Sequence, residues 1–331
     1  MKKALVSLGS LLMIGAVLQA GSPARGASGN VVIAAAGDIA CASPPDTMGS
    51  GCRYGQTSDL IYNHGYRKVL VLGDEQYPTG ALSDFQSYYD STWGRFKSKT
   101  NPVPGNHEYN NNYPGGAPGY FSYFPSRVQG PTPDAGYYSY DLPAGCTPTG
   151  SNVCWHVIAL NSEVCSASDG GPGCGSGTKE YLWLQSDLAS HPSSTYPCTL
   201  AYWHHPRFAW TDAGDGTSGG SSAIQSFWSL LVANHADIVL NGHVHDYQHY
   251  RPMGRSGGGN PDGITEFIVG TGGVGLESQP TTAQPATLVA SQFANFGILK
   301  MTLKASSWTY QWISATGGTF TDASTSDIAC V

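Results

Sequence analysis

The sequence predicts an α/β domain whose C-terminal part is rich in strands. Two observations support this fold class. Apolar, β-branched runs such as Val69–Leu72, typical of buried strands, alternate with amphipathic segments such as Lys179–Ala189, typical of surface helices. After His245 the helical pattern gives way to strand-like runs separated by polar turns. The 331 residues show no repeat and no long linker, so we expect one domain over residues 28–331.

The elements follow from the same patterns along the chain. The expected strands are 30–36, 69–72, 137–142, 153–161, 199–203, 238–240, 267–270, 297–303 and 308–313. The expected helices are 56–66, capped near Thr57, and 82–96, 179–189 and 224–233. The first helix lies between the first two strands, which predicts a βαβ unit.

Composition excludes one class of partner. The formal net charge is −7, only 12% of residues are charged, and basic residues are not concentrated anywhere. A nucleic-acid surface therefore has no electrostatic support. The 43 glycines and 21 prolines indicate long ordered loops rather than a helical bundle.

The first 27 residues have the pattern of a secretory signal peptide. Lys2 and Lys3 precede an apolar run over residues 4–18, and small residues follow it. The run is shorter than a membrane-spanning helix requires. We therefore expect a secreted, extracellular protein that begins near Ser28 and has no membrane segment after cleavage.

Cysteine usage agrees with export. All eight cysteines follow the cleavage zone, and an even number in an exported chain predicts disulfides rather than a thiolate metal site. No two of them form a C-x-x-C pair, so a zinc ribbon is not expected. The simplest pairing hypothesis is Cys41–Cys52, Cys146–Cys154, Cys165–Cys174 and Cys198–Cys330.

Five predicted strand ends carry polar residues that can bind metal ions. Carboxylates, imidazoles, an amide oxygen and a phenolate suit zinc, iron or manganese, and ligands of α/β sheets gather outside the carboxyl ends of strands. Each motif alone is weak, because a single Gly-Asp is usually a turn, but five in order favour a site. The candidates are Asp38, then Asp74 and Tyr77, then Asn106 and His107, then His204 and His205, then His243 and His245.

A glycine precedes several of these candidates, which predicts sharp turns close to the bound ion. The series resembles the calcineurin-like metallophosphoesterases and, within them, the purple acid phosphatase type. The motifs that carry the resemblance are Asp38-Ile39-Ala40, Gly73-Asp74-Glu75-Gln76-Tyr77, Gly105-Asn106-His107-Glu108 and Gly242-His243-Val244-His245. Tyr77, together with the absence of a histidine after Asp38, is the variation of the purple acid phosphatases. Two departures, Ala40 where glycine is usual and Asp246-Tyr247-Gln248 after the last motif, leave the subfamily open.

The resemblance implies a four-layer α/β/β/α sandwich of two mixed β-sheets flanked by helices. It assigns one metal to Asp38, Asp74, Tyr77 and His245, and the other to Asp74, Asn106, His204 and His243, with Asp74 bridging. His204 is preferred over His205 because His-x-Pro matches the spacing of the family. His107 is then a catalytic residue that faces the substrate, and His205 is a weaker candidate for the same role.

The implied activity is that of a phosphatase that hydrolyses small phosphate monoesters by attack of a metal-bound hydroxide, as in acid phosphatases. The implied cofactors are two metal ions, Fe(III) beside Tyr77 and a divalent zinc, iron or manganese ion. Three alternatives remain open: a phosphodiesterase or nucleotidase with the same metals, a non-catalytic exported binding protein, and a Tyr77 that only packs against its loop. The sequence makes no prediction of the oligomeric state.

Overall fold

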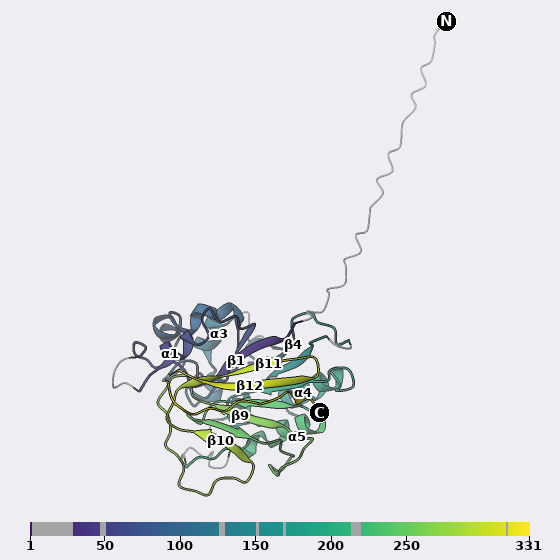
Figure 1. Ribbon diagram of the computed structural model, residues 1–331. Helices are drawn as coiled ribbons and strands as arrows, with labels where there is room; N and C mark the ends of the chain where they lie inside the picture. Colours follow the sequence, from purple (N-terminus) through teal and green to yellow (C-terminus); the bar gives the residue numbers. More distant parts are fainter. Residues whose placement is uncertain are drawn as a thin grey trace.

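The strands form two mixed β-sheets that pack face to face (Figure 1). The protein is seen here in a computed structural model, which describes residue 1 and residues 29–46, 51–125, 130–149, 152–167, 170–212, 220–315 and 317–331. The predicted signal peptide, apart from Met1, lies outside the described residues.

The first sheet has six strands and the second has seven. In spatial order the first contains β13 (Ile328–Ala329), β12 (Ser307–Ser314), β11 (Gly297–Leu303), β1 (Val31–Ala36), β2 (Lys68–Val71) and β3 (Thr100–Pro102). The second contains β10 (Leu288–Gln292), β8 (Tyr247–Tyr250), β9 (Thr265–Val269), β7 (Ile238–Asn241), β6 (Thr199–Tyr202), β5 (Trp155–Ala159) and β4 (Tyr138–Leu142).

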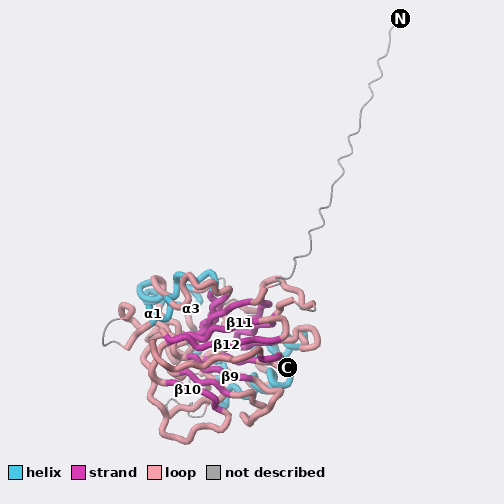
Figure 2. Tube along the Cα trace, in the orientation of Figure 1, coloured by secondary structure: helices cyan, strands magenta, loops and turns pink. Residues whose placement is uncertain are grey.

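Helices are short and lie at the periphery, around the strands (Figure 2). The α-helices are α1 (Tyr54–Asp59), α2 (Leu82–Asp84), α3 (Pro118–Tyr123), α4 (Lys179–Ser190) and α5 (Gln225–Ala233). The π-helix and 3-10 segments are η1 (Phe85–Tyr89), η2 (Trp93–Lys99), η3 (Tyr113–Gly115), η4 (Ser162–Cys165) and η5 (Ser222–Ile224). No helix in the described part of the chain is both long and apolar enough to span a membrane.

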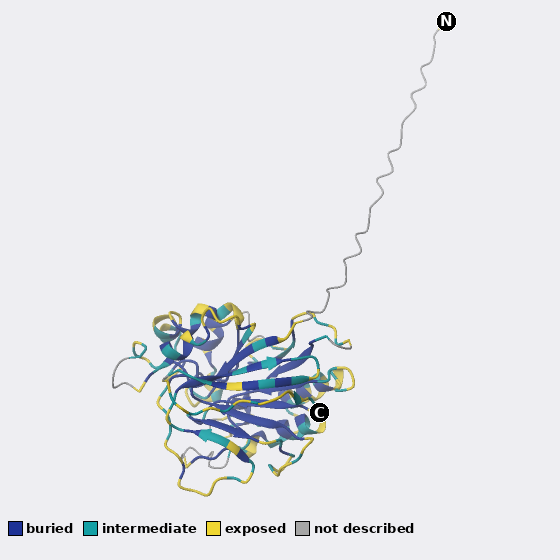
Figure 3. Cartoon of the chain, viewed as in Figure 1, coloured by how far each residue is buried: buried dark blue, intermediate teal, exposed yellow. Residues whose placement is uncertain are grey.

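The strands of the second sheet show how the layers form. Their side chains alternate between two cores, because successive residues of a strand point to opposite faces. In β7, Ile238 and Leu240 join the core between the sheets, while Val239 joins the core under α4 and α5. Helices α1 and α3 lie beside the first sheet instead (Figure 1), and the strands are buried throughout most of both sheets (Figure 3). The predicted four-layer sandwich is therefore confirmed.

The loops that carry the predicted ligands follow parallel strands and lie at the same edge of the sandwich. β1, β2 and β3 run parallel to one another, as do β5, β6 and β7, so their carboxyl ends lie together within each sheet. The sheets are joined at this edge, where the backbone N–H of Gly37, after β1, donates to the carbonyl of Val269 in β9 at 2.9 Å.

The predicted disulfide pairing is confirmed in all four cases: Cys41–Cys52, Cys146–Cys154, Cys165–Cys174 and Cys198–Cys330. The pair Cys146–Cys154 closes the connection between the antiparallel strands β4 and β5. The pair Cys198–Cys330 ties the C-terminal end of the chain to the start of β6.

Two helix predictions are wrong. The segment 82–96 is not one helix but α2, a π-helix and part of a 3-10 segment in succession. Its aromatic side chains direct its path: the indole N–H of Trp93 donates to Tyr54 O at 3.1 Å, and Phe85 packs against Tyr123. The helix expected over 56–66 is the shorter α1, and Thr57 does not cap it, because its hydroxyl donates to Gly272 O in the core.

Candidate metal centre

The nine predicted site residues meet where the carboxyl ends of strands from both sheets come together, and each contacts at least one of the others. Asp38 follows β1, Asp74 and Tyr77 follow β2, Asn106 and His107 follow β3, His204 and His205 follow β6, and His243 and His245 follow β7. These positions lie far apart in the sequence, so the fold alone makes them neighbours.

One group of side chains converges on the hydroxyl of Tyr77. This oxygen lies 3.0 Å from Asp38 Oδ1, 2.8 Å from Asp74 Oδ2 and 3.0 Å from His245 Nε2. The other ring nitrogen of His245, Nδ1, lies 2.9 Å from Gly275 O and therefore carries the proton that it donates to this carbonyl. Nε2 is left to present its lone pair to the group, as metal-binding histidines do.

A second group converges on the amide oxygen of Asn106. His204 Nε2 lies 3.0 Å and His243 Nδ1 lies 3.2 Å from Asn106 Oδ1. His204 Nε2 is also 3.3 Å from Asp74 Oδ2, the same oxygen that contacts Tyr77. Asp74 Oδ2 is thus common to both groups, whose members are the residues that the resemblance assigns to the two metals.

The second group contains acceptor atoms that need a positive charge between them. Asn106 donates its amide N–H to Asn111 at 2.8 Å, and His204 donates from Nδ1 to Leu72 O at 2.8 Å. The remaining atoms, Oδ1 and Nε2, are both acceptors that face each other, and a cation or an added proton must lie between them. Burial lowers the pKa of His204, but the carboxylate of Asp74 raises it to about 10, so the negative charges that would hold this proton would equally hold a metal ion.

The backbone also holds the carboxylates in place. Asp38 Oδ2 accepts from the N–H of His243 and Asp74 Oδ1 accepts from the N–H of His107, both at 2.9 Å, which leaves the other oxygen of each for the centre. Asp38, Asp74 and His243 all have positive φ angles, of 61°, 51° and 71°. Such angles cost about 1–3 kcal/mol per residue and persist at functional sites where the surroundings enforce them.

Three glycines make room for this packing. A Cβ at Gly73 would lie 2.5 Å from His204 Nδ1, one at Gly242 would lie 2.7 Å from Asp38 Oδ2, and one at Gly105 would overlap Asp74. The expectation that these glycines make sharp turns holds at Gly73, whose φ is 87°. Gly105 and Gly242 are required for space instead, because each lies directly against a carboxylate from another strand.

Glu108 supports the site, a role that the sequence alone did not indicate. Its Oε2 accepts from the N–H groups of Asp74 and Gly105, each at 2.9 Å, and its Oε1 accepts from the N–H of Gln76 at 3.1 Å. It thereby joins the loops after β2 and β3. Burial, followed by the charge of Asp74, raises the pKa of Glu108 to about 8. Its place in the Gly-Asn-His-Glu motif was the signal that could have identified it.

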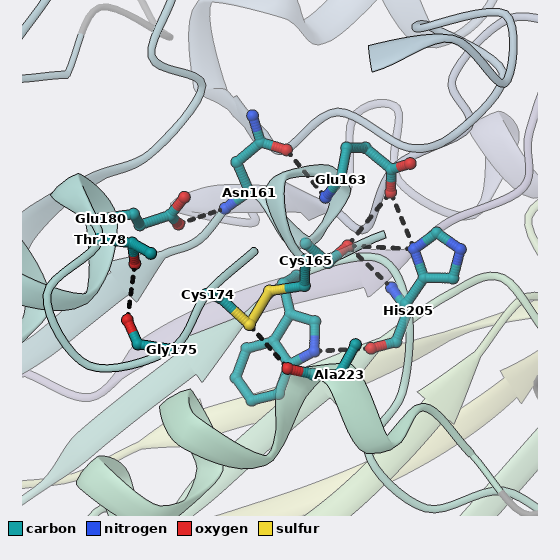
Figure 4. Close-up of a disulfide and its surroundings, with 11 residues drawn as sticks. Asn161, Glu163, Cys165, Cys174, Gly175, Thr178, Glu180, His205 and Ala223 are labelled. Carbon is teal, nitrogen blue, oxygen red and sulfur yellow. Dashed lines mark hydrogen bonds and ion pairs between the residues drawn. A yellow bond between two sulfur atoms is a disulfide. The ribbon is translucent and has the colours of Figure 1, made fainter. Parts of the chain in front are cut away.

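His107 and His205 lie beside the two groups rather than within them. His107 donates from Nδ1 to Pro78 O at 2.6 Å, and its Nε2 is 3.9 Å from Asp74 Oδ2, with 27% of the side chain exposed. The ring of His205 lies 4.1 Å from that of His243, and its Nδ1 is 2.8 Å from Glu163 Oε1 (Figure 4). No sequence pattern connects Glu163 with His205, so this pair could not have been predicted.

A two-sheet sandwich with such a cluster at its edge is the architecture of metal-dependent phosphoesterases. The model of the calcineurin-like phosphoesterase family matches residues 31–247, and the chain belongs to this family. Relatives include Purple acid phosphatase 22 of Arabidopsis thaliana, 32% identical over 28% of this chain and 21% of that protein. Purple acid phosphatase 15 of the same plant is 28% identical over 58% of this chain and 37% of that protein. The matches thus span well under two thirds of the relatives' length.

Solved structures share the fold. The purple acid phosphatase PPD1 from yellow lupin (Lupinus luteus) seeds has a TM-score of 0.64 and 18% identity, covering 89% of this chain and 53% of that one. GAP50, described as the anchor in the inner membrane complex of Plasmodium, has a TM-score of 0.63 and 15% identity, covering 88% of each chain. At these identities the likeness concerns the fold alone.

Proposed function

We propose that this protein is an exported phosphatase that uses two metal ions to hydrolyse small phosphate monoesters. The observation that carries the proposal is the position of Asp74 Oδ2, which contacts the Tyr77 hydroxyl at 2.8 Å on one side and His204 Nε2 at 3.3 Å on the other. A carboxylate oxygen shared by two ligand groups is what a bridged metal pair requires. The four disulfides support export.

We propose that Asp38, Asp74, Tyr77 and His245 hold one ion and that Asp74, Asn106, His204 and His243 hold the other. When bound, such a pair lowers the pKa of water and stabilises the charges of an in-line phosphoryl transfer. Asp38, Asp74 and an ionised Tyr77 bring three negative charges. An Fe(III) ion beside Tyr77 with divalent zinc, iron or manganese leaves the centre positive, which favours a phosphate dianion.

His107 is the proposed catalytic side chain of this protein. Its Nδ1–H bond to Pro78 O fixes the orientation of the ring, so that Nε2 points towards the cluster from the solvent side. From there it can donate a hydrogen bond or a proton to the ester oxygen as the bond to phosphorus breaks. His205, held by Glu163, is the second candidate for contact with the phosphoryl group.

The comparisons also bear on the alternatives. One relative is named "Probable inactive purple acid phosphatase 9", 27% identical over 46% of this chain and 21% of that protein, and GAP50 is described as an anchor. A chain that has lost catalysis is expected to have lost ligands. Here both ligand groups are complete, which favours an enzyme.

The test combines metal analysis with two substrates. The purified, exported protein should contain two metal ions per chain and hydrolyse p-nitrophenyl phosphate much faster than bis-p-nitrophenyl phosphate. A preference for the diester would refute the proposed monoesterase activity and support a phosphodiesterase instead. A protein that binds metals but cleaves neither ester would support the binding-protein alternative, and one that binds no metal would refute the proposed centre.

A further inference from the structure

A cavity of about 520 Å³ lies apart from the metal centre, next to the N-terminal end of α4. The residues that line it include Tyr113, Thr132, Tyr137, Val164, Thr178 and Glu180. The segment 161–163 separates the cavity from the metal centre, since Asn161 contacts Glu180 on one side and Glu163 reaches His205 on the other (Figure 4). The volume is within the range of about 300–1,000 Å³ that is usual for small-molecule sites.

The rings of Tyr113 and Tyr137 line the cavity, and each packs against another aromatic ring. Tyr113 stacks on Tyr109, with ring centroids 5.0 Å apart and an interplanar angle of 26°. Tyr137 packs against Trp183, also with centroids 5.0 Å apart. Tyr109 is itself fixed, because its hydroxyl accepts from the side-chain amide of Asn161 at 2.9 Å. Rings supported in this way lose little conformational entropy when a ligand stacks on them.

Glu180 contributes a buried carboxyl group to the lining of the cavity. It is only 3% exposed, and its Oε1 accepts from the backbone N–H of Asn161 at 2.7 Å. Its Oε2 is buried and has no hydrogen-bond partner among the described residues. Burial raises the pKa of Glu180 well above its usual value, which favours the protonated form that carries a hydroxyl donor. A buried polar group without a partner is unfavourable, and a hydrogen bond to a ligand would remove that cost.

The charges of the lining indicate an uncharged ligand. Besides Glu180 the lining carries Asp134 and Lys179, which offset each other, and none of the described lining residues is an arginine or histidine. The described lining therefore has no arginine or histidine to bind phosphate, and Asp134 balances the charge of its one lysine. We propose that it binds the flat, uncharged ring of an aromatic or heteroaromatic molecule, stacked on the tyrosines and hydrogen-bonded by Glu180.

This inference does not depend on the proposed phosphatase activity, so its test measures binding without turnover. The probe is adenosine, a heteroaromatic nucleoside without phosphate, titrated calorimetrically into the whole exported protein. We expect one site with a dissociation constant on the order of 0.1 mM, as ligand efficiency allows for a molecule of this size. Methyl glucoside, which has hydroxyls but no flat ring, should not bind.

Three variants identify the site. Thr132→Trp, at an exposed lining position, puts a bulky indole against the cavity and should weaken adenosine binding at least about tenfold. Glu180→Gln keeps an acceptor for Asn161 and a donor for the ligand, so it should bind as wild type does. Asp74→Asn should also bind normally, which separates the cavity from the metal centre. Absence of binding by wild type, undiminished binding by Thr132→Trp, or equal binding of methyl glucoside would each overturn the proposal.

Discussion

Two clusters of histidines and aspartates lie at opposite edges of the seven-stranded sheet, and they differ in ring geometry. At the metal centre the rings of His204 and His243 are inclined by 77°. In the second cluster the rings of His156 and His191 are stacked, with centroids 3.8 Å apart and planes only 10° from parallel. A metal ion lies in the plane of each imidazole that binds it, and two stacked rings share no such point. Ligand atoms of Asp141, His156 and His191 lie within 4.8 Å of one another, but the stacked rings are poorly oriented to share an ion.

The hydrogen bonds of the histidines also differ between the two clusters. At the metal centre each of His204 and His245 uses one nitrogen for a backbone carbonyl and keeps the other for the cluster. Both nitrogens of His156 instead face carboxylates, Nε2 at 2.8 Å from Asp187 and Nδ1 at 3.3 Å from Asp141. Carboxylates facing both nitrogens favour the protonated form of His156. The same residue types thus form a candidate metal centre at one edge and an ion pair at the other.

The largest expected effect comes from Asp74→Asn, which weakens the ligand set of both ions. We expect loss of about one metal ion or more per chain and a fall in kcat of at least ~10³-fold. Metal analysis and turnover of p-nitrophenyl phosphate measure this. Asp187→Asn, in the second cluster, is the matched control and should keep both metals and near-normal turnover. If Asp74→Asn behaved in the same way, Asp74 would not be a bridging ligand.

His107→Ala tests the side chain that faces substrate. Removal of a positioned general acid costs about 10²–10⁴-fold in rate, while the metal content should stay at the wild-type value. Glu180→Gln, outside the centre, provides the control for general damage to the fold. A variant that lost metal together with activity would make His107 a ligand and would refute its proposed role.

His156→Leu tests the second cluster and should act on stability alone. Removing the cation leaves Asp141 and Asp187 without a charged partner, which we expect to cost about 2–3 kcal/mol. Fully buried pairs lose about 3–5 kcal/mol, but 22% of the Asp141 side chain is open to solvent. Urea unfolding measures the loss. The metal content should remain at the wild-type value, and its decrease would mean that the second cluster also binds an ion.

The contribution of His156 should depend on pH. Burial lowers the pKa of His156, but the hydrogen bonds and charges of Asp141 and Asp187 raise it above its usual value. A pKa raised by folding gives stability that is fully present below the unfolded value of about 6.5 and is lost as pH rises through the folded value. The difference in unfolding free energy between wild type and His156→Leu should therefore shrink from pH 6 towards alkaline pH. A difference that grew with pH would contradict the ion pair.

Tyr77→Phe should remove one ligand of the proposed Fe(III) ion and change the spectrum of the protein completely. With Fe(III) beside it, an ionised tyrosine gives a visible charge-transfer band, so the wild-type protein should be pink to purple. In the metal-free chain, burial and the charges of Asp38 and Asp74 raise the pKa of Tyr77 well above its usual value, and a strong Lewis acid is needed to ionise it. The variant should fold normally without the band. A colourless, iron-free and fully active wild type would refute the Fe(III) assignment.

The sequence by itself determined where the central strands lie along the chain and which polar residues follow them. A buried strand needs a continuous apolar run such as Val69–Leu72, and the Gly-Asp that follows reveals its end. Disulfide pairing was predictable for a similar reason, because three of the four bridges close loops of fewer than a dozen residues. These features depend on short-range pattern, which one chain displays directly.

The tertiary structure decided the rest. Strand β8 was missed because its sequence, Tyr-Gln-His-Tyr, is polar. Its His249 is buried against Phe267 and bonded at 3.0 Å to Asp322, which lies far along the chain. The partnership of Glu163 with His205 and the stacking of His156 on His191 are equally invisible in the sequence. Which nitrogen of a histidine carries a proton, and where its ring plane points, depends on atoms that only folding brings within hydrogen-bonding distance.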